Sequence, residues 1–424
     1  MIALTPIFFF IIIYLVASIV AGDFYKVPIS VAFMLTAIVA IATSKGEIKE
    51  RINTFSKGAG ESNIMLMIWI FILAGAFANS AKTLGSIDDV VYLTLSVVPP
   101  SAMFVGLFLA AALISLSVGT SVGTIVALTP IAAGIASATG NSLPMVTAIV
   151  VGGAFFGDNL SFISDTTVVA TQTQGCRMSD KFLTNIKVAL PAALLMVVLY
   201  IFLGNEVVIR DIYPEVNWLK IVPYLAVLVT AIMGMNVLFV LCIGSLLTGA
   251  IGLYLGTYDL YSWFGAMGDG ILGMGELIIV TMLAGGILEL IRANGGIQYL
   301  MDKILRRINS PRSAELSIAA LVSFVDICTA NNTVAIITVA GIAKDISQKF
   351  SLDPRRVASI LDTFSCIMQG IIPYGAQLLM AAALSKQNPI DIIPYMYYPY
   401  TLAIFSIIAI MIQKRNKANE YVRN

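Results

Sequence analysis

Two aspartates lie seven residues apart in a short stretch that is rich in hydroxyl and amide groups. Carboxylate, hydroxyl and amide oxygens are the ligands that hard, weakly held cations prefer. A carboxylate among them binds either a cation or a proton, and this competition is the simplest physical basis for exchanging one for the other. Both aspartates are alternatively caps of half-helices, a role compatible with ion binding because helix ends attract ions. The predicted ion-binding residues of this stretch are Asp158, Asn159, Ser161, Ser164, Asp165 and Thr166.

Further acidic residues lie in apolar parts of the chain, notably Asp326 and Asp362. A charged side chain at the centre of a bilayer costs about 2.5–3.5 kcal/mol on insertion scales, which makes such residues functional candidates. The chain contains no histidine, so the usual proton carrier near neutral pH is absent. The predicted proton carriers are therefore Asp158, Asp165 and Asp362.

The composition predicts an all-α polytopic membrane protein. The chain is 58% hydrophobic and 12% charged, whereas soluble domains carry about 25% charged residues. About 20 apolar helical residues cross a bilayer core. The alternating pattern of an outer-membrane barrel is absent, and a net charge of +1 gives no indication of a nucleic-acid partner. The apolar stretches are 5–22, 27–43, 64–84, 101–118, 188–204, 221–235, 237–256, 271–291 and 393–413.

The two halves of the chain repeat each other at a spacing of 210 residues. Gly58 matches Gly268, Gly75 matches Gly285, and other pairs match at the same spacing. An internal duplication in an apolar chain is typical of secondary transporters. The predicted organisation is a first repeat (1–205), a connecting loop (206–220), a second repeat (221–413) and a cytoplasmic tail (414–424).

Loop charges indicate that the two repeats have inverted topology. The loop 44–61 carries four basic residues and its counterpart 254–271 carries none, whereas the turn 85–100 carries none and its counterpart 295–312 carries four. Basic residues mark cytoplasmic loops, so two homologous halves with opposite loop charge must lie in opposite orientations. We expect a multi-pass protein of the bacterial inner membrane with both termini in the cytoplasm.

Four stretches predict broken or re-entrant helices. They are rich in Gly, Asn, Ser and Thr, which are weak helix formers, and they lie at 117–124, 157–167, 326–333 and 362–377. Unwound backbone survives in lipid only where protein or water satisfies it, and breaks at equivalent positions of two repeats point to a binding site. Close helix packing is the alternative for the first stretch. Further predicted site residues are Ser121, Thr124, Asp326, Asn331, Asn332, Thr333, Asp362 and Gln377.

The run from Gly153 to Thr167 resembles the signature G-D-x-x-S-P-L-S-D-T-T of the NhaC family of sodium/proton antiporters, with Phe162 in place of the proline. The resemblance implies exchange of Na⁺ for H⁺ across the plasma membrane, with Asp158 and Asp165 as transient Na⁺ ligands. The second half departs from the family pattern, because Tyr374 and Gly375 replace Trp-Asn. Relatives of the family also exchange small organic acids or move amino acids, so a coupled transporter of such a solute is the alternative.

Other classes of protein fit the sequence less well. An intramembrane aspartyl protease needs G-x-G-D, and the corresponding residues, Phe155 to Asp158, lack the first glycine. A passive channel does not require inverted repeats with broken helices. We therefore expect no enzymatic activity, no catalytic residue and no cofactor. The expected partners are the lipid bilayer, Na⁺ and H⁺, and no nucleic acid; a small organic acid or amino acid and a homodimer remain open.

Overall fold

The computed structural model describes residues 2–21, 28–162, 164–204, 216–233, 235–305 and 308–412. These residues form helices joined by short turns, and they contain no strand. The prediction of an all-α protein is therefore confirmed. The predicted tail 414–424 lies outside the described residues, as do most of the connecting loop 206–220 and two of the basic residues in the turn 295–312.

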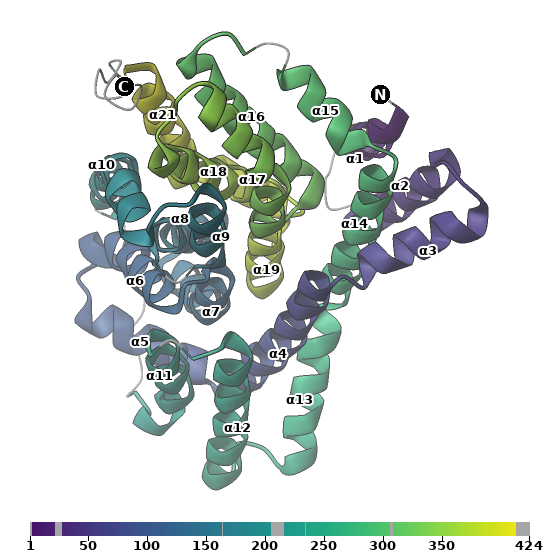
Figure 1. Ribbon diagram of the computed structural model, residues 1–424. Coiled ribbons are helices and arrows are strands. Elements are labelled where there is room, and N and C mark those ends of the chain that lie inside the picture. Colours follow the sequence, from purple (N-terminus) through teal and green to yellow (C-terminus); the bar gives the residue numbers. More distant parts are fainter. Residues whose placement is uncertain are drawn as a thin grey trace.

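Figure 1 shows the arrangement of the helices in the two halves of the chain. Those of the first half are α1 (Thr5–Ala21), α2 (Ile29–Thr43), α3 (Ile48–Ala59), α4 (Ser62–Leu84), α5 (Ser86–Val97), α6 (Met103–Val118), α7 (Ser121–Thr139), α8 (Leu143–Leu160), α9 (Asp165–Gln174) and α10 (Met178–Gly204). Those of the second half are α11 (Trp218–Ile232), α12 (Val237–Leu255), α13 (Leu260–Gly273), α14 (Gly275–Ala293), α15 (Gly296–Leu305), α16 (Pro311–Thr329), α17 (Asn332–Lys349), α18 (Pro354–Gln369), α19 (Ala376–Ser385), α20 (Pro389–Ile392) and α21 (Tyr397–Ile412).

Contacts between the halves are reciprocal. Helix α4 packs on α13 while α14 packs on α3, and α9 packs on α17 while α19 packs on α7. By position in the chain, α13, α14, α17 and α19 correspond to α3, α4, α7 and α9. The α4–α13 contact therefore corresponds to the α14–α3 contact, and the α9–α17 contact to the α19–α7 contact. Reciprocal contacts of this kind are what a two-fold relation between two copies predicts. The opposite orientation of the halves in a membrane stays a prediction.

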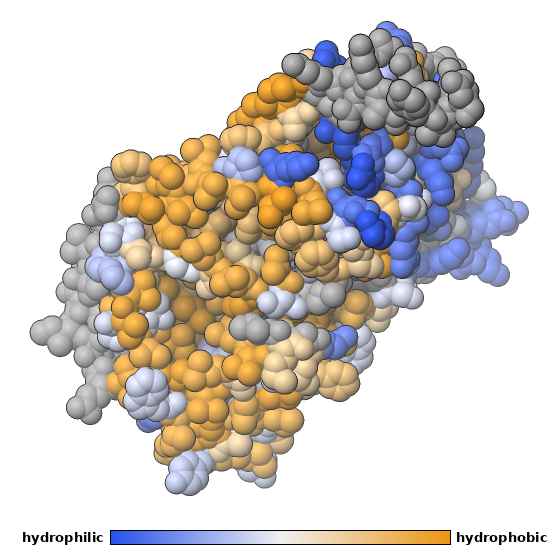
Figure 2. All heavy atoms as spheres, turned by 60° about the vertical axis from the view of Figure 1, so that its left-hand side comes forward, coloured by the Kyte–Doolittle hydropathy of each residue, from blue (hydrophilic) through white to orange (hydrophobic). Residues whose placement is uncertain are grey.

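Seven helices in the described part of the chain are long and apolar enough to cross a bilayer, and eight if the bent pair Pro389–Tyr395 and Tyr397–Ile412 counts as one span. Two of the seven, Ser121–Thr139 and Leu143–Gln174, contain the polar motifs and were not among the apolar stretches expected to span. Two expected spans are instead short helices, Ile29–Thr43 and Trp218–Ala231. Figure 2 shows apolar side chains covering a broad area of one face, with hydrophilic side chains gathered toward one end.

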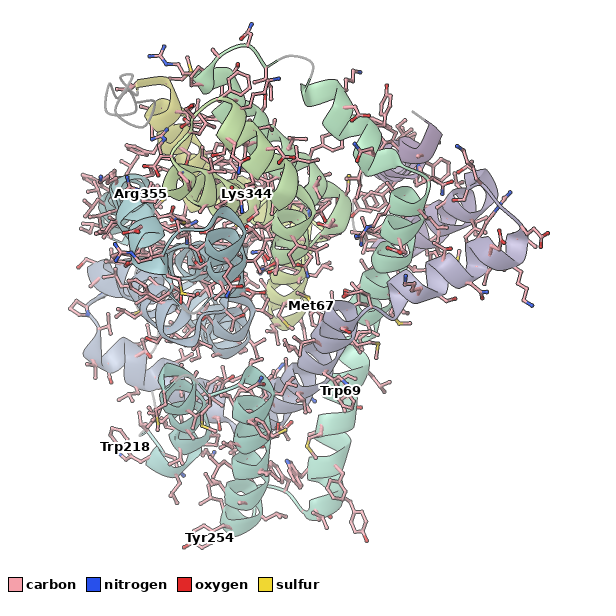
Figure 3. All side chains as sticks on the ribbon, viewed as in Figure 1. Met67, Trp69, Trp218, Tyr254, Lys344 and Arg355 are labelled. Carbon is pink, nitrogen blue, oxygen red and sulfur yellow. The ribbon has the colours of Figure 1, made fainter. Side chains whose placement is uncertain are left out.

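Aromatic side chains project from the end of the molecule that α11 and α12 form. Trp218 and Tyr254 point outward at the bottom of Figure 3, and both are largely exposed. Tyrosine and tryptophan are enriched where a membrane meets water, because their rings are apolar and their tips polar. This end of the bundle is therefore suited to a membrane–water boundary.

Glycines bring the two halves into backbone contact. The paired helices α3–α4 and α13–α14 cross in the long diagonal of Figure 1. A Cβ atom on Gly75 would lie 2.3 Å from the carbonyl oxygen of Gly270, and one on Gly58 would lie 2.4 Å from that of Gly285. Small residues allow membrane helices to approach this closely. The crossing therefore depends on the absence of side chains at both contacts.

A nearly buried ion pair joins α16 to α18. The guanidinium of Arg356 donates two hydrogen bonds of 2.7 Å to the carboxylate of Glu315, whose side chain is almost buried. Breaking a buried pair leaves an uncompensated charge. We expect Arg356→Met to lower the free energy of unfolding by about 3 kcal/mol, measured as a fall in the midpoint of thermal unfolding in detergent.

The neighbouring Arg355 provides the control for this substitution. It lies at the periphery (Figure 3), and its side chain is more than half exposed and pairs with Asp353, two residues before it. Exposed pairs contribute roughly 0–1 kcal/mol, so Arg355→Met should barely move the midpoint. Equal shifts for the two variants would show that the bidentate pair does not hold α16 and α18 together.

Candidate functional site

All four predicted helix breaks are present. They separate α6 from α7, α8 from α9, α16 from α17, and α18 from α19. The first and third breaks occupy equivalent places, and each turns through a residue in the left-handed region, Gly119 with φ 72° and Ala330 with φ 49°. This conformation costs a non-glycine residue roughly 1–2 kcal/mol, and such strain is typical of functional sites. The breaks place half-helix ends and polar side chains inside the bundle.

Two hydroxyl groups, from different segments of the chain, donate to the carboxylate of Asp158, which is 3% exposed. Ser121, at the start of α7, donates to Oδ2 at 2.8 Å. Ser164, in the break before α9, donates to Oδ1 at 2.6 Å and shares a hydrogen bond of 2.8 Å with the hydroxyl of Thr166. These four predicted site residues therefore form one cluster around a buried carboxylate.

A chain of amide groups extends this cluster into the second half. Gln377 Nε2 donates to Ser121 Oγ at 3.0 Å, and Gln369 Nε2 donates to Gln377 Oε1 at 2.9 Å. Gln369 also donates to the backbone carbonyl of Ala330 at 2.9 Å, which belongs to the α16–α17 break. Gln377 was predicted and Gln369 was not. The breaks of both halves are thus joined by side-chain hydrogen bonds.

A second cluster surrounds Asp362 on α18. Lys181 Nζ on α10 lies 2.5 Å from Asp362 Oδ2, and both side chains are at most 1% exposed. The amide groups of Asn159 and Asn185 donate to the same oxygen at 3.0 and 3.1 Å. Lys181 also donates to the carbonyl oxygen of Asn159 at 2.6 Å and to the hydroxyl of Thr167 at 2.7 Å.

Sequence reasoning missed Lys181 and Asn185 in this cluster. Lys181 lies among polar residues just before the apolar stretch 188–204, where a basic residue is typical of a loop at the membrane surface. One signal could have found it: Lys181 and Asn185 lie four residues apart and share a helix face, and that face continues into the apolar span of α10.

The helix break separates Asp165 from Asp158. On one continuous helix the two carboxylates would share a face, but the break buries Asp158 and leaves Asp165 exposed. Asp165 accepts a hydrogen bond of 2.6 Å from Thr333 at the start of α17. The neighbouring Asn331 caps α17 by accepting from the backbone of Val334 at 3.0 Å. The hydrogen bond between Asp165 and Thr333 therefore also joins the two halves.

Other predicted residues lie outside both clusters. Thr124 donates to the carbonyl of Thr120 within its own turn at 3.2 Å, Ser161 donates to the carbonyl of Leu116 at 3.0 Å, and Asn332 accepts from the backbone of Thr333 at 3.1 Å. Asp326 is fully buried, and within the described residues neither of its carboxyl oxygens has a hydrogen-bond partner. Because an unpaired charge in such surroundings is costly, this environment suits the neutral acid.

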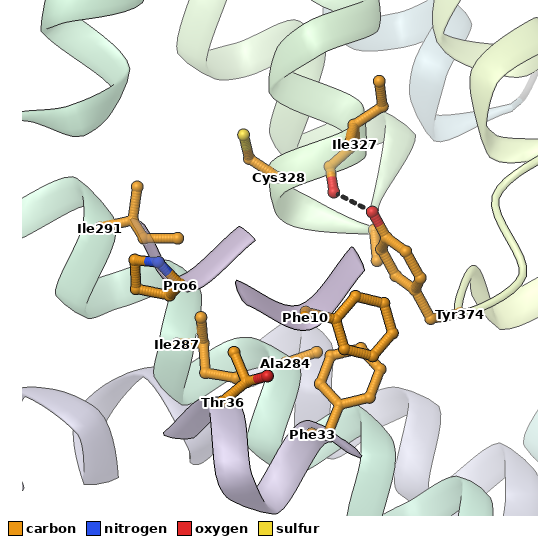
Figure 4. A pocket seen from close by; sticks show the side chains of 11 residues that line it. Pro6, Phe10, Phe33, Thr36, Ala284, Ile287, Ile291, Ile327, Cys328 and Tyr374 are labelled. Carbon is orange, nitrogen blue, oxygen red and sulfur yellow. Dashed lines mark hydrogen bonds between the residues drawn. The ribbon is translucent and has the colours of Figure 1, made fainter. Parts of the chain in front are cut away.

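An apolar cavity lies beside the α16–α17 break (Figure 4). Its walls come from α1, α2, α14 and the end of α16, with Phe10, Phe33 and Tyr374 as ring-bearing residues. Tyr374 packs edge-on against both phenylalanines and donates to the carbonyl of Ile327 at 2.7 Å. With so few polar groups in its walls, the cavity is unsuited to hold a metal ion.

Broken helices whose half-helix ends meet inside a membrane bundle are typical of secondary transporters. The sequence profile described as the Na⁺/H⁺ antiporter family matches residues 1–205 and 213–413. The chain therefore belongs to the Na⁺/H⁺ antiporter family, as the motif around Asp158 and Asp165 predicted.

Individual relatives cover most of the chain. It is 25% identical to the Na⁺/H⁺ antiporter NhaC of Bacillus subtilis, over 84% of this chain and 85% of that protein. It is 22% identical to the Na⁺/H⁺ antiporter NhaC of Alkalihalophilus pseudofirmus, over 82% and 83%. It is 21% identical to the malate-2H⁺/Na⁺-lactate antiporter of Bacillus subtilis, over 82% and 81%.

Proposed function

We propose that this protein is a sodium/proton antiporter that exchanges Na⁺ for H⁺ across the inner membrane of a bacterial cell. Membership of the family and similarity to two proteins named NhaC support this function. The observation that carries it is the buried carboxylate of Asp158, which lies at a helix break and accepts hydrogen bonds from the hydroxyl groups of Ser121 and Ser164, with the hydroxyl of Thr166 bonded to Ser164.

The chemistry of Asp158 supplies a mechanism of exchange. Na⁺ binds to the carboxylate and to the hydroxyl oxygens of Ser121, Ser164 and Thr166, which rotate their protons away because a hydroxyl both donates and accepts. A proton neutralises the same carboxylate and releases the cation. The site is electrically neutral with either ligand, whereas the empty carboxylate is a buried charge that costs several kcal/mol. The protein therefore switches the site from one side of the membrane to the other readily only when Na⁺ or H⁺ is bound. This requirement couples the movement of Na⁺ to that of H⁺.

The same proposal places the halves in opposite orientations, with both termini in the cytoplasm. The basic loops 44–61 and 295–312 then lie on the cytoplasmic side. Single cysteines that replace Lys49 and Lys303 in a cysteine-free background should both react with an impermeant thiol reagent only from that side. Reaction from opposite sides would contradict the inverted arrangement.

Exchange of an organic acid is the second candidate. The malate-2H⁺/Na⁺-lactate antiporter covers the chain almost as completely as the NhaC proteins do. The amide groups of Gln369 and Gln377 fit this candidate as well as the first, because amide N–H groups bind an organic carboxylate as readily as amide oxygens bind a cation.

Proteoliposomes with a fluorescent pH indicator separate the two candidates. We expect external NaCl alone to dissipate an acid-inside gradient, with choline chloride as the inactive control. A protein that moves no protons until malate or lactate is added would contradict sodium/proton exchange and support the second candidate.

A further inference from the structure

The ammonium group of Lys181 occupies a cage of oxygen atoms. Three of them are within hydrogen-bond distance: Asp362 Oδ2 at 2.5 Å, the carbonyl oxygen of Asn159 at 2.6 Å, and the hydroxyl of Thr167 at 2.7 Å. They come from α18, α8 and α9, and so from both halves of the chain and both sides of the α8–α9 break. One positive charge is thus surrounded by a carboxylate, a carbonyl and a hydroxyl.

Two further buried oxygens beside this cage lack a partner. Within the described residues, Asp362 Oδ1 and Asn185 Oδ1 accept no hydrogen bond. Buried polar atoms are nearly always paired, and an exception calls for an explanation such as an absent ion or water. The ammonium has three N–H donors, and the three oxygens of the cage take all of them, so these two oxygens stay unpaired. A free cation can take more oxygen ligands than the ammonium does.

We propose that the oxygen cage around the Lys181 ammonium is a second binding position for the transported monovalent cation, which the lysine side chain fills when no cation is bound there. A carboxylate, a carbonyl and a hydroxyl are the oxygens that hard cations take. Two positive charges so close to one carboxylate repel each other, so the cage holds either the ammonium or the cation. This inference rests on the proposed function, because it concerns the same cation.

Equilibrium binding of ²²Na⁺ to purified protein in detergent tests the cage without any transport. Lys181→Met removes the competing charge and keeps an unbranched side chain. We expect the Na⁺ concentration at half-saturation to fall about tenfold or more, or a second Na⁺ to bind per chain. Adding Asp362→Asn to this variant should remove the gain. Lys187→Met changes an exposed lysine on the same helix and should bind Na⁺ as the unchanged protein does.

Thermal unfolding covers the case in which Lys181→Met folds poorly. Its unpaired carboxylate should make the variant unstable in choline chloride, and NaCl should restore stability, because a ligand that binds only the folded state stabilises it. Failure to fold even in NaCl would overturn the proposal, since Na⁺ would then not replace the ammonium. Unchanged Na⁺ binding by a folded variant would also overturn it and leave a purely structural ion pair.

The two proposals fail in different experiments. Absence of Na⁺-driven proton movement in proteoliposomes of the unchanged protein contradicts sodium/proton exchange. The binding and unfolding measurements on Lys181→Met are made in detergent without a gradient, and they report on the cage alone.

Discussion

Asp158→Asn is expected to abolish the exchange of Na⁺ for H⁺, with a fall in the initial rate of roughly 100-fold or more. The amide has the shape of the carboxylate and can still accept from Ser121, so the fold should survive. The amide carries no charge to bind Na⁺ and takes up no proton, so the transport of both ions is lost. The rate of Na⁺-driven proton movement in proteoliposomes measures the effect.

The control is the same substitution at an exposed aspartate. Asp269 lies on α13 with its side chain exposed, and Asp269→Asn should leave the rate unchanged. Comparable rates in Asp158→Asn and the unchanged protein would exclude Asp158 as the shared site of cation and proton. Loss of the thermal transition in Asp158→Asn would instead reveal a structural role for the carboxylate.

Gly75→Leu is expected to prevent stable folding, or to lower the free energy of unfolding by about 3 kcal/mol or more. Its Cβ would lie 2.3 Å from the carbonyl oxygen of Gly270, and that obstacle is main chain that cannot rotate aside. The helices would have to separate along the α4–α13 contact. The yield of monodisperse protein and the midpoint of thermal unfolding measure the effect.

Gly268 offers a matched control on α13. A Cβ there would meet nothing within 4 Å, although this glycine corresponds to Gly58 in the sequence repeat. Gly268→Leu should keep or slightly raise stability, because leucine is a better helix former than glycine by about 1 kcal/mol. Similar losses of stability in the two leucine variants would mean that the close contact between α4 and α13 is not the reason why Gly75 is required.

The helix breaks were predictable because their causes are local. Glycine, asparagine, serine and threonine compete with helical hydrogen bonding wherever they cluster, and the cluster around Asp158 also carries the chemistry. The same residues explain why two membrane-spanning stretches, Ser121–Thr139 and Leu143–Gln174, were missing from the apolar stretches predicted from the sequence. Helix α7 and the stretch Leu143–Gln174, which comprises α8 and α9, are long and apolar enough to cross the membrane, but their polar motifs obscured that in the sequence.

The second cluster was not predictable, because it depends on how distant helices pack. Lys181 is flanked by polar residues that resemble a loop, yet its long side chain carries the ammonium to Asp362 from another helix. Gln369 joins the breaks of the two halves through bonds to residues eight and 39 positions away in the sequence. The carboxylate of Asp326 shows the opposite case, since burial was predictable and the absence of a partner in the described residues was not.

The glycine contacts between the two halves limit which substitutions the chain tolerates at the crossing. Gly58 meets Gly285, and Gly75 meets Gly270, so each copy presents bare main chain to the other. A larger residue in one copy cannot be accommodated by a smaller one in its partner, because nothing smaller than glycine exists. Each of these four positions therefore depends on its counterpart across the crossing, and a change at one of them cannot be offset at the other.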